Sequence, residues 1–132
     1  WRCDGHVGRS YHKPVKGFVM TLKGSSSTKM QLPKTRSRGL ALAQRYLVVQ
    51  LCLVREKSFM MELGVCDAEG TRRRLVFSTS FSQMASTPLH GQIPLCFMEA
   101  LCGRWCNVVF DLSELTLGLF RAKEFKSLEH IL

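Results

Sequence analysis

The feature that most constrains the fold is a pair of β-like runs joined by a short turn. Residues 58–67, "SFMMELGVCD", alternate apolar side chains with other residues, a period of two that is typical of a strand with one buried face. "DAEG" is a turn signal, and residues 71–78, "TRRRLVFS", form a second run. Together they predict a β-hairpin. The inward side chains of its first strand are then Phe59, Met61, Leu63 and Val65.

Other β-like runs occur on the N-terminal side of this hairpin. Residues 17–24, "GFVMTLKG", alternate, and residues 28–34 offer a short partner strand. That partner should end at Pro33, because proline has no N–H to donate to a sheet. Residues 45–54 are apolar at nearly every position, which predicts a central strand buried on both faces.

The C-terminal part repeats the pattern around one helical segment. Pro88 and Pro94 bracket residues 87–95 and predict an edge or irregular strand there. Further strands are expected at residues 104–112 and 125–132. Residues 111–120, "DLSELTLGLF", predict a short helix with Ser113 as N-cap, although Gly118 weakens it. The apolar residues at helical spacing are Leu115, Leu119 and Phe120.

About eight short strands, with turn signals every ~8–12 residues and one short helix, predict an all-β fold. We expect a single antiparallel β-sandwich, similar to a jelly roll, because 132 residues make one domain. The domain would span residues 1–132. The chain starts at Trp1 rather than methionine and stops inside an apolar alternation, so we expect a fragment truncated at both ends. The predicted core consists of Phe18, Leu51, Phe59, Leu75, Phe77, Val109 and Phe110.

The positive charge is confined to one part of the chain. Residues 1–46 hold ten Lys and Arg against the single acid Asp4, which gives 10 − 1 = +9. The remaining residues hold nine bases and nine acids, which cancel. A local excess of this kind favours an anionic partner, such as nucleic acid, a membrane face or an acidic protein. The alternative is a solvated surface without a partner.

Neither a metal site nor catalytic equipment is expected. Cys3, His6 and His12 lack the two short-spaced pairs of structural zinc, and so do Cys96, Cys102 and Cys106. His90, in "STPLHG", is the only histidine deep in the chain with hydroxyls nearby, and nothing in the sequence orients it as a base. We therefore predict no enzyme activity, no cofactor and no small-molecule substrate.

The six cysteines and the hydropathy indicate a compartment rather than a function. Cys52, Cys66 and Cys106 sit inside apolar runs, where a thiol behaves as a small core residue, so we expect reduced cysteines in the cytoplasm. No segment approaches the ~20 apolar residues that span a membrane. No membrane association and no signal peptide are therefore expected.

The three consecutive arginines are the candidate binding residues. In a strand, Arg72 and Arg74 share one face, while Arg73 shares the opposite face with Leu75 and Phe77. Arginine holds carboxylates or phosphates bidentately, so the outward pair could engage an acidic protein. The alternative is that neighbouring acids of the chain pair with them. Those acids are Glu56, Glu62 and Glu69.

The aromatic residues leave a second alternative open. Trp1, Tyr11, Tyr46 and Trp105 could form a platform for a sugar or a nucleobase. Tyr46 and Trp105 each open an apolar run, where a large ring more often closes the end of a core.

Several segments, taken in order, resemble a known family. They are "VKGFVMTLKGSSSTKMQLPK", "LALAQRYLVVQL", "GTRRRLVFSTSFSQMASTPLHGQIPL" and "RWCNVVFDLSEL". The chain is similar to the domain of the cilia- and flagella-associated protein twenty family, closest to its larger domain-containing relatives. The resemblance implies a jelly-roll-like sandwich that acts as a structural component of cilia, centrioles and microtubule doublets. It also implies contacts with tubulin and axonemal proteins, and no enzyme activity.

The residues and the resemblance lead to one functional prediction. We expect a non-catalytic interaction module of the microtubule cytoskeleton, in the axoneme of a cilium or flagellum or in a basal body. Its basic surface would meet acidic protein such as tubulin. The expected contact residues are Arg72, Arg74, Lys34, Arg36 and Arg38. A nucleic-acid-binding sandwich and a glycan-binding module are the alternatives.

Overall fold

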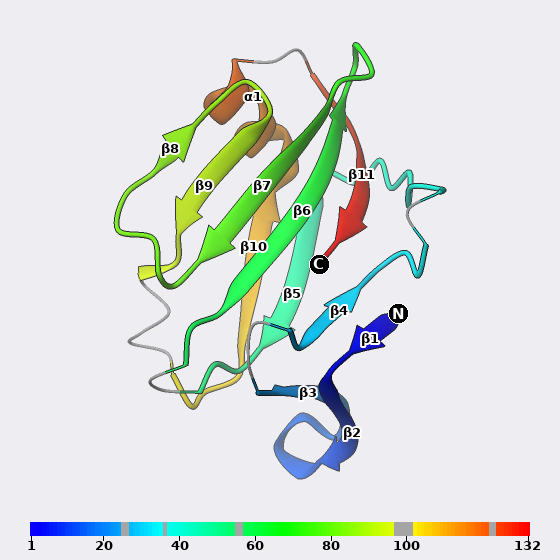
Figure 1. Ribbon diagram of the computed structural model, residues 1–132, viewed down its shortest axis with the longest axis vertical. Coiled ribbons are helices and arrows are strands. Elements are labelled where there is room, and N and C mark those ends of the chain that lie inside the picture. The colour runs from blue at the N-terminus through cyan, green and yellow to red at the C-terminus, as the bar shows by residue number, and fades with distance from the viewer. Residues whose placement is uncertain (25–26, 36, 55–56, 97–101, 122–123) are drawn as a thin grey trace.

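The computed structural model describes the chain except residues 25–26, 36, 55–56, 97–101 and 122–123. The described residues form eleven strands, a 3-10 turn and one α-helix (Figure 1). The predicted all-β class with one short helix is confirmed. The eight expected strands are all present, and three more were missed. The missed strands are β1 (Arg2–Asp4), β2 (His6–His12) and β8 (Ala85–Ser86).

A five-stranded sheet, in the order β11-β6-β7-β9-β8, makes the front layer in Figure 1. The predicted hairpin is confirmed: β6 (Met60–Asp67) pairs antiparallel with β7 (Arg72–Ser78). On its other side β6 pairs antiparallel with β11 (Phe125–Ile131). β9 (His90–Pro94) lies between β7 and the two-residue β8, so it is not the outermost strand.

One pairing departs from the antiparallel expectation. β9 runs parallel to β7, with Leu75 opposite Gly91 and Phe77 opposite Ile93. The physical reason is the long connection through residues 79–89, which carries the chain back along the sheet before β9 begins. A direct tight turn would have produced an antiparallel pair.

Behind this sheet lie β5 (Tyr46–Leu51) and β10 (Cys106–Asp111), an antiparallel pair (Figure 1). The core lies between the two layers. The rings of Phe77 and Phe110 meet across it, 4.7 Å apart and tilted by 63°. Around them lie the most deeply buried side chains, which are Leu63, Val65, Leu75, Leu112 and Leu128.

The expectation that residues 45–54 form a strand buried on both faces is wrong. Side chains of β5 alternate, with Leu47, Val49 and Leu51 half-buried and Tyr46 and Val48 exposed. Val109, predicted to be in the core, pairs with Val48 on the same exposed face. The reason is that no described element covers the outer face of this pair, which a continuous apolar run does not reveal.

The helix α1 (Leu112–Phe120) closes one end of the sandwich (Figure 1). Its N-cap is Asp111, whose Oδ1 accepts from the Glu114 N–H at 3.1 Å, so the prediction of Ser113 is wrong. The helix begins one residue after β10 ends, which places the cap two residues earlier than expected. Leu119 and Phe120 pack so closely on Gly91 that a β-carbon there would lie 3.2 and 3.3 Å from them.

The N-terminal strands pair differently from the prediction. β3 (Gly17–Lys23) forms an antiparallel ribbon with β2 through the 3-10 turn Lys13–Val15, whereas β4 (Lys29–Gln31) pairs with β1. Phe18, predicted to be in the core, is 65% exposed. β2 was missed because its large apolar residues are only Val7 and Tyr11, too few to produce an alternation.

The basic segment after β4 is fastened along the free edge of β11. Leu32 exchanges backbone hydrogen bonds of 2.8 Å with Ile131, and Leu42 exchanges bonds of 3.1 and 2.8 Å with Leu128. Between them the Leu40 N–H donates to the Glu129 carbonyl at 2.9 Å. These contacts bring the loop that carries Arg38 beside the five-stranded sheet.

Candidate protein interaction site

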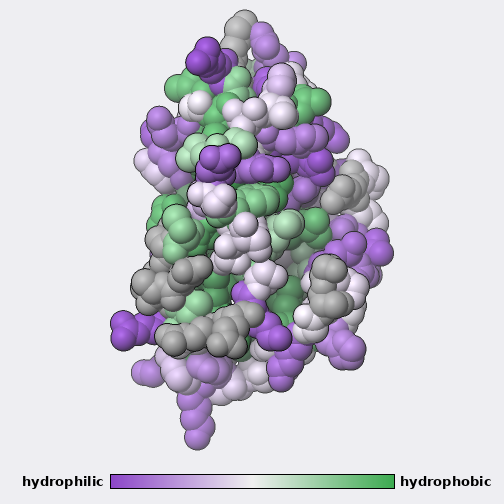
Figure 2. Space-filling model, turned by 60° about the vertical axis from the view of Figure 1, so that its left-hand side comes forward, coloured by the Kyte–Doolittle hydropathy of each residue, from purple (hydrophilic) through white to green (hydrophobic). Residues whose placement is uncertain are grey.

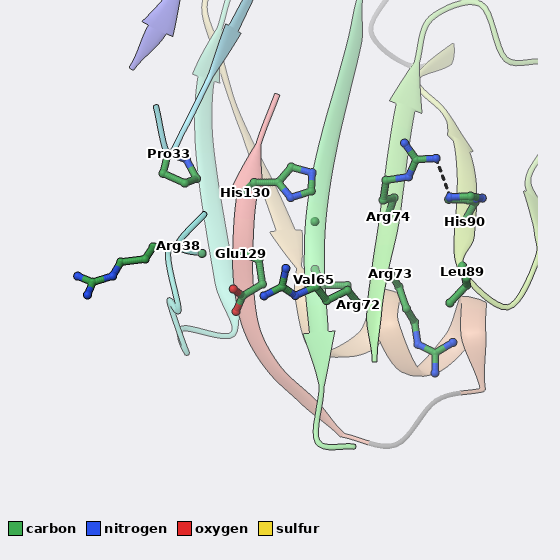
Figure 3. A pocket seen from close by; sticks show the side chains of 12 residues that line it. Pro33, Arg38, Val65, Arg72, Arg73, Arg74, Leu89, His90, Glu129 and His130 are labelled. Atoms are coloured by element: carbon green, nitrogen blue, oxygen red, sulfur yellow. Dashed lines mark hydrogen bonds between the residues drawn. The ribbon is translucent and has the colours of Figure 1, made fainter. Parts of the chain in front are cut away.

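The arginine triplet begins β7, and its faces are as predicted. Arg72 and Arg74 are exposed, Arg73 is half-buried, and Leu75 beyond them is buried. Figure 3 shows Arg73 directed away from the other two, toward α1. The triplet therefore contains two kinds of arginine.

Arg73 has a structural role. Its Nε and Nη2 atoms donate to Asp67 Oδ2 at 3.1 and 2.8 Å, and its Nη1 atom donates to the Pro88 carbonyl. The guanidinium carbon lies 5.3 Å from the centre of the Phe120 ring. The side chain of Arg73 is 11% exposed and that of Asp67 0%, so the pair is buried. Arg73 fastens the β6–β7 turn to α1 and to the segment that leads into β9.

The carboxylate of Asp67 shows how this turn is held. Burial by itself raises the pKa of Asp67, but the hydrogen bonds from Arg73 and from backbone N–H groups outweigh burial and leave the pKa lowered. The backbone donors are Thr71 and Glu69, at 2.8 and 3.1 Å from Oδ1. Asp67 therefore stays ionised inside the fold.

Arg74 is partly neutralised by the domain itself. Its Nη1 donates to Glu62 Oε2 at 3.3 Å, so the alternative of an internal partner holds for Glu62. Its Nη2 lies 2.6 Å from His90 Nε2. A guanidinium only donates, so this nitrogen of His90 is the acceptor. The side chain of Arg74 remains 47% exposed.

Arg72 and Arg74 line a hollow of about 270 Å³ on the outer face of the sheet, together with Arg38, His90 and Glu129 (Figure 3). Gly64 forms part of its lining, and a β-carbon there would lie 2.0 Å from the ring of His130.

Two residues of β11 shape the hollow, and sequence reasoning missed both. His130 covers Gly64, and its Nε2 lies 2.9 Å from Glu62 Oε1. Glu129 accepts from the Ser127 hydroxyl at 2.5 Å and fills the space left by Gly39, where a β-carbon would lie 1.6 Å from Glu129 Oε2. The register of β11 shifts between Leu128 and His130, so simple alternation does not predict these positions.

The other predicted contact residues have different positions. Arg38 lines the rim of the hollow and points away from the sheet in Figure 3. Lys34 is exposed next to Pro33 but does not line the hollow. Arg36 lies outside the described residues. Within the described part of the chain, no ion pair involves Arg38, Arg72 or Lys34.

The remaining candidate chemistry is not assembled in the structure. Cys3, His6 and His12 do not converge, and the described residues contain no group of three potential metal ligands. Tyr46 and Trp105 lie at opposite ends of the β5–β10 pair, because Tyr46 pairs with Asp111 and Cys106 with Leu51. They therefore form no common aromatic platform. In the described residues, no helix has the length and hydropathy to cross a membrane.

Another side of the molecule carries apolar residues among polar ones. Figure 2 shows hydrophobic residues reaching the surface across the middle of the side on which β8 and β9 lie. A second hollow, of about 290 Å³, lies between β9 and β10. Its lining includes Phe77, Ile93, Leu95, Val108, Phe110 and Leu115. Of these two hollows, the one lined by Arg38, Arg72 and Arg74 therefore carries the arginines.

Comparison with known proteins identifies the family. The CFA20 domain matches residues 1–132. WD repeat-containing protein 90 of Mus musculus is 33% identical over 141 residues, covering 97% of this chain and 8% of the relative. The Homo sapiens protein is 34% identical over 128 residues, covering 86% of this chain and 7% of the relative.

The Xenopus tropicalis protein of the same name is 31% identical over 110 residues, covering 82% of this chain and 6% of the relative. The chain thus spans less than a tenth of the length of these relatives. The chain belongs to the CFA20 domain family, whose name, after cilia- and flagella-associated protein 20, indicates a ciliary context.

Proposed function

We propose that this domain is a non-catalytic interaction module of the ciliary or centriolar microtubule cytoskeleton. It would dock through Arg72 and Arg38 onto an acidic protein surface such as that of tubulin. Lys34 and Arg74 would add positive charge at the edge of the contact. The supporting observation is that Arg72 and Arg38 come from separate segments, line one hollow and have no ion pair with a described residue.

The chemistry of the hollow suits a carboxylate. A guanidinium presents two parallel N–H groups that match the two oxygens of a glutamate or aspartate side chain. Arg73 takes no part, because Asp67 and the Pro88 carbonyl occupy its donors. Arg74 contributes less than Arg72, because Glu62 already shares its charge.

The family supports the proposed setting. The domain matches a small portion of much longer WD repeat-containing relatives, so it would serve as an attachment site in a larger polypeptide. The local excess of positive charge would steer the protein toward an acidic filament and make binding depend on salt. In the axoneme or basal body this attachment would fix the rest of the polypeptide to the microtubule wall.

Co-sedimentation with microtubules tests the proposal. Charge reversal in Arg38→Glu/Arg72→Glu should weaken binding about tenfold or more, which corresponds to ~1.4 kcal/mol or more. The control Lys57→Glu/Arg104→Glu makes the same two charge reversals at exposed positions outside the hollow and keeps the net charge equal. Raising the salt concentration should weaken wild-type binding and reduce the gap between wild type and Arg38→Glu/Arg72→Glu.

Two results would contradict the proposal. If Arg38→Glu/Arg72→Glu pellets with microtubules as well as Lys57→Glu/Arg104→Glu does, the hollow is not the docking surface. If wild type ignores microtubules but binds single-stranded oligothymidine in a manner that needs Arg72, the nucleic-acid alternative is favoured.

A further inference from the structure

The β2–β3 ribbon is a second basic surface that the proposed function does not use. It lies at the lower end of the molecule in Figure 1, whereas β7 begins at the upper end, beside the β6–β7 turn. The ribbon is therefore separate from the arginine hollow, whose lining comes from β6, β7, β11 and the segments beside them. A ligand on the ribbon would not compete directly with one in the hollow.

The register of the ribbon gathers large side chains on one face. Val7 lies opposite Leu22, Arg9 opposite Met20, and Tyr11 opposite Phe18. Residues opposite one another in a sheet point to the same side. Phe18 is 65% exposed and Leu22 is 47% exposed, and Met20 and Tyr11 are exposed as well. We name this face, formed by Tyr11, Phe18, Met20, Leu22 and Arg9, the ribbon strip.

The opposite face of the ribbon is turned toward the body of the domain. The ring of His12 lies 5.5 Å from that of Trp105, just before β10, and Val19 and Thr21 are half-buried. The ribbon strip consequently faces away from the sandwich. The Tyr11 and Phe18 rings meet edge to face at 5.7 Å, which holds the strip in one arrangement.

The charge around the strip restricts what can cover it. The sequence has no aspartate or glutamate from Gly5 to Arg55, and the ribbon carries Arg9, Lys13, Lys16 and Lys23. A second copy of this chain would bring like charges together, which opposes self-association through this face. The complementary partner is negatively charged.

We propose that the ribbon strip binds an acidic segment of a partner protein, with apolar side chains against Phe18 and Met20 and a carboxylate on Arg9. The position of Arg9 favours protein over lipid. It lies in the middle of the strip, 4.5 Å above the centre of the Phe18 ring, where acyl chains would desolvate the guanidinium without a counter-charge.

The composition of the strip favours protein over nucleic acid. Bases stack on exposed ring faces, but Arg9 already covers one face of Phe18. Met20 and Leu22 offer alkyl surface, which suits leucine or methionine side chains better than bases. The domain thus carries two separate sites for acidic protein and can join two partners, or two parts of one partner.

Selection from a library of short random peptides displayed on phage tests this inference. The immobilised chain serves as bait, and binders to Phe18→Ser/Met20→Ser are removed first. The selected peptides should combine Asp or Glu with Leu, Ile, Phe or Met. A synthetic copy of the best peptide should bind Phe18→Ser and Arg9→Gln about tenfold more weakly than wild type. Thermal melting of each variant verifies the fold.

The matched control is Val48→Ser, which removes an apolar side chain of similar exposed fraction, 58%, from β5. It should leave peptide affinity unchanged. The inference is overturned if no peptides are enriched, if they lack acidic residues, or if the ribbon variants bind like the control. It is also overturned if vesicles of phosphatidylserine and phosphatidylcholine, or oligothymidine, bind more tightly than the peptide with the same dependence on Phe18. Because Arg38 and Arg72 are intact in every ribbon variant, failure here leaves the microtubule experiment unaffected.

Discussion

Replacing Arg73 by leucine should destabilise the domain far more than the same change at its neighbour Arg72. The change removes both N–H donors to Asp67 Oδ2 and the donor to the Pro88 carbonyl. It leaves a carboxylate whose side chain is fully buried. Among the described residues, only the backbone N–H groups of Glu69 and Thr71 then still donate to that carboxylate, on Oδ1.

The size of the effect follows from burial. Removing one member of a buried ion pair costs about 3–5 kcal/mol, and the two remaining backbone donors place this case near 3 kcal/mol. Domains of this size have a total stability of about 5–15 kcal/mol, so the loss is a large fraction of it. It corresponds to a fall in Tm of roughly 10–15 °C.

Urea unfolding followed by circular dichroism at neutral pH measures the loss. Arg72→Leu is the matched control, since Arg72 is exposed and has no ion pair with a described residue, and it should change stability by less than about 0.5 kcal/mol. The double variant Asp67→Leu/Arg73→Leu should recover part of the loss, because it removes the unpaired buried charge. Equal midpoints for Arg73→Leu and Arg72→Leu would refute the distinction between a structural and a binding arginine.

Three further predictions concern the same framework. The pKa of Asp67 is lower in the folded chain than its ordinary 3.8, so the stability that ionised Asp67 gives the fold is complete above that pH and is lost as the pH falls below it. Acid unfolding should therefore steepen below about pH 4, and Asp67→Asn should flatten this part of the curve. Asp111→Ala should lower the free energy of unfolding in urea by about 1 kcal/mol, because the carboxylate of Asp111 caps α1 and also binds Arg45. Ser113→Ala should leave it almost unchanged, and equal effects of the two variants would restore Ser113 as the cap. Gly64→Ala should lower stability by about 1–3 kcal/mol, because the new β-carbon would clash with the ring of His130, and an unchanged Tm would show that the ring moves aside.

The arginine site shows both the reach and the limit of sequence reasoning. The period of two in "TRRRLVF" separates Arg73 from Arg72 and Arg74, and the structure confirms this separation. The sequence also proposes Glu62 among the internal partners, which is correct for Arg74. It groups Arg38 with Arg72 among the expected contact residues, but it does not show that both line one hollow, because that depends on the backbone contacts that fasten the segment from Leu32 to Leu42 to β11.

The errors in the core assignment have a common cause. Phe18 and Val109 are apolar residues in correctly predicted strands, yet both are exposed. Alternation shows that two faces differ, but it does not show whether another layer covers either face. Coverage depends on the number of strands in each sheet, and β5 and β10 are alone in theirs among the described residues.

By itself, the sequence determined the all-β class, the β6–β7 hairpin and the opposite orientations of Arg73 and its neighbours. These properties follow from local backbone geometry, in which successive side chains of a strand point to opposite faces whatever the rest of the chain does. Only the tertiary structure decided that β2 pairs with β3, that β9 runs parallel to β7, and that Arg73 is buried against Asp67 while Arg72 stays exposed. Those outcomes depend on contacts between residues distant in sequence, whose free energy is set by which surfaces lose water together.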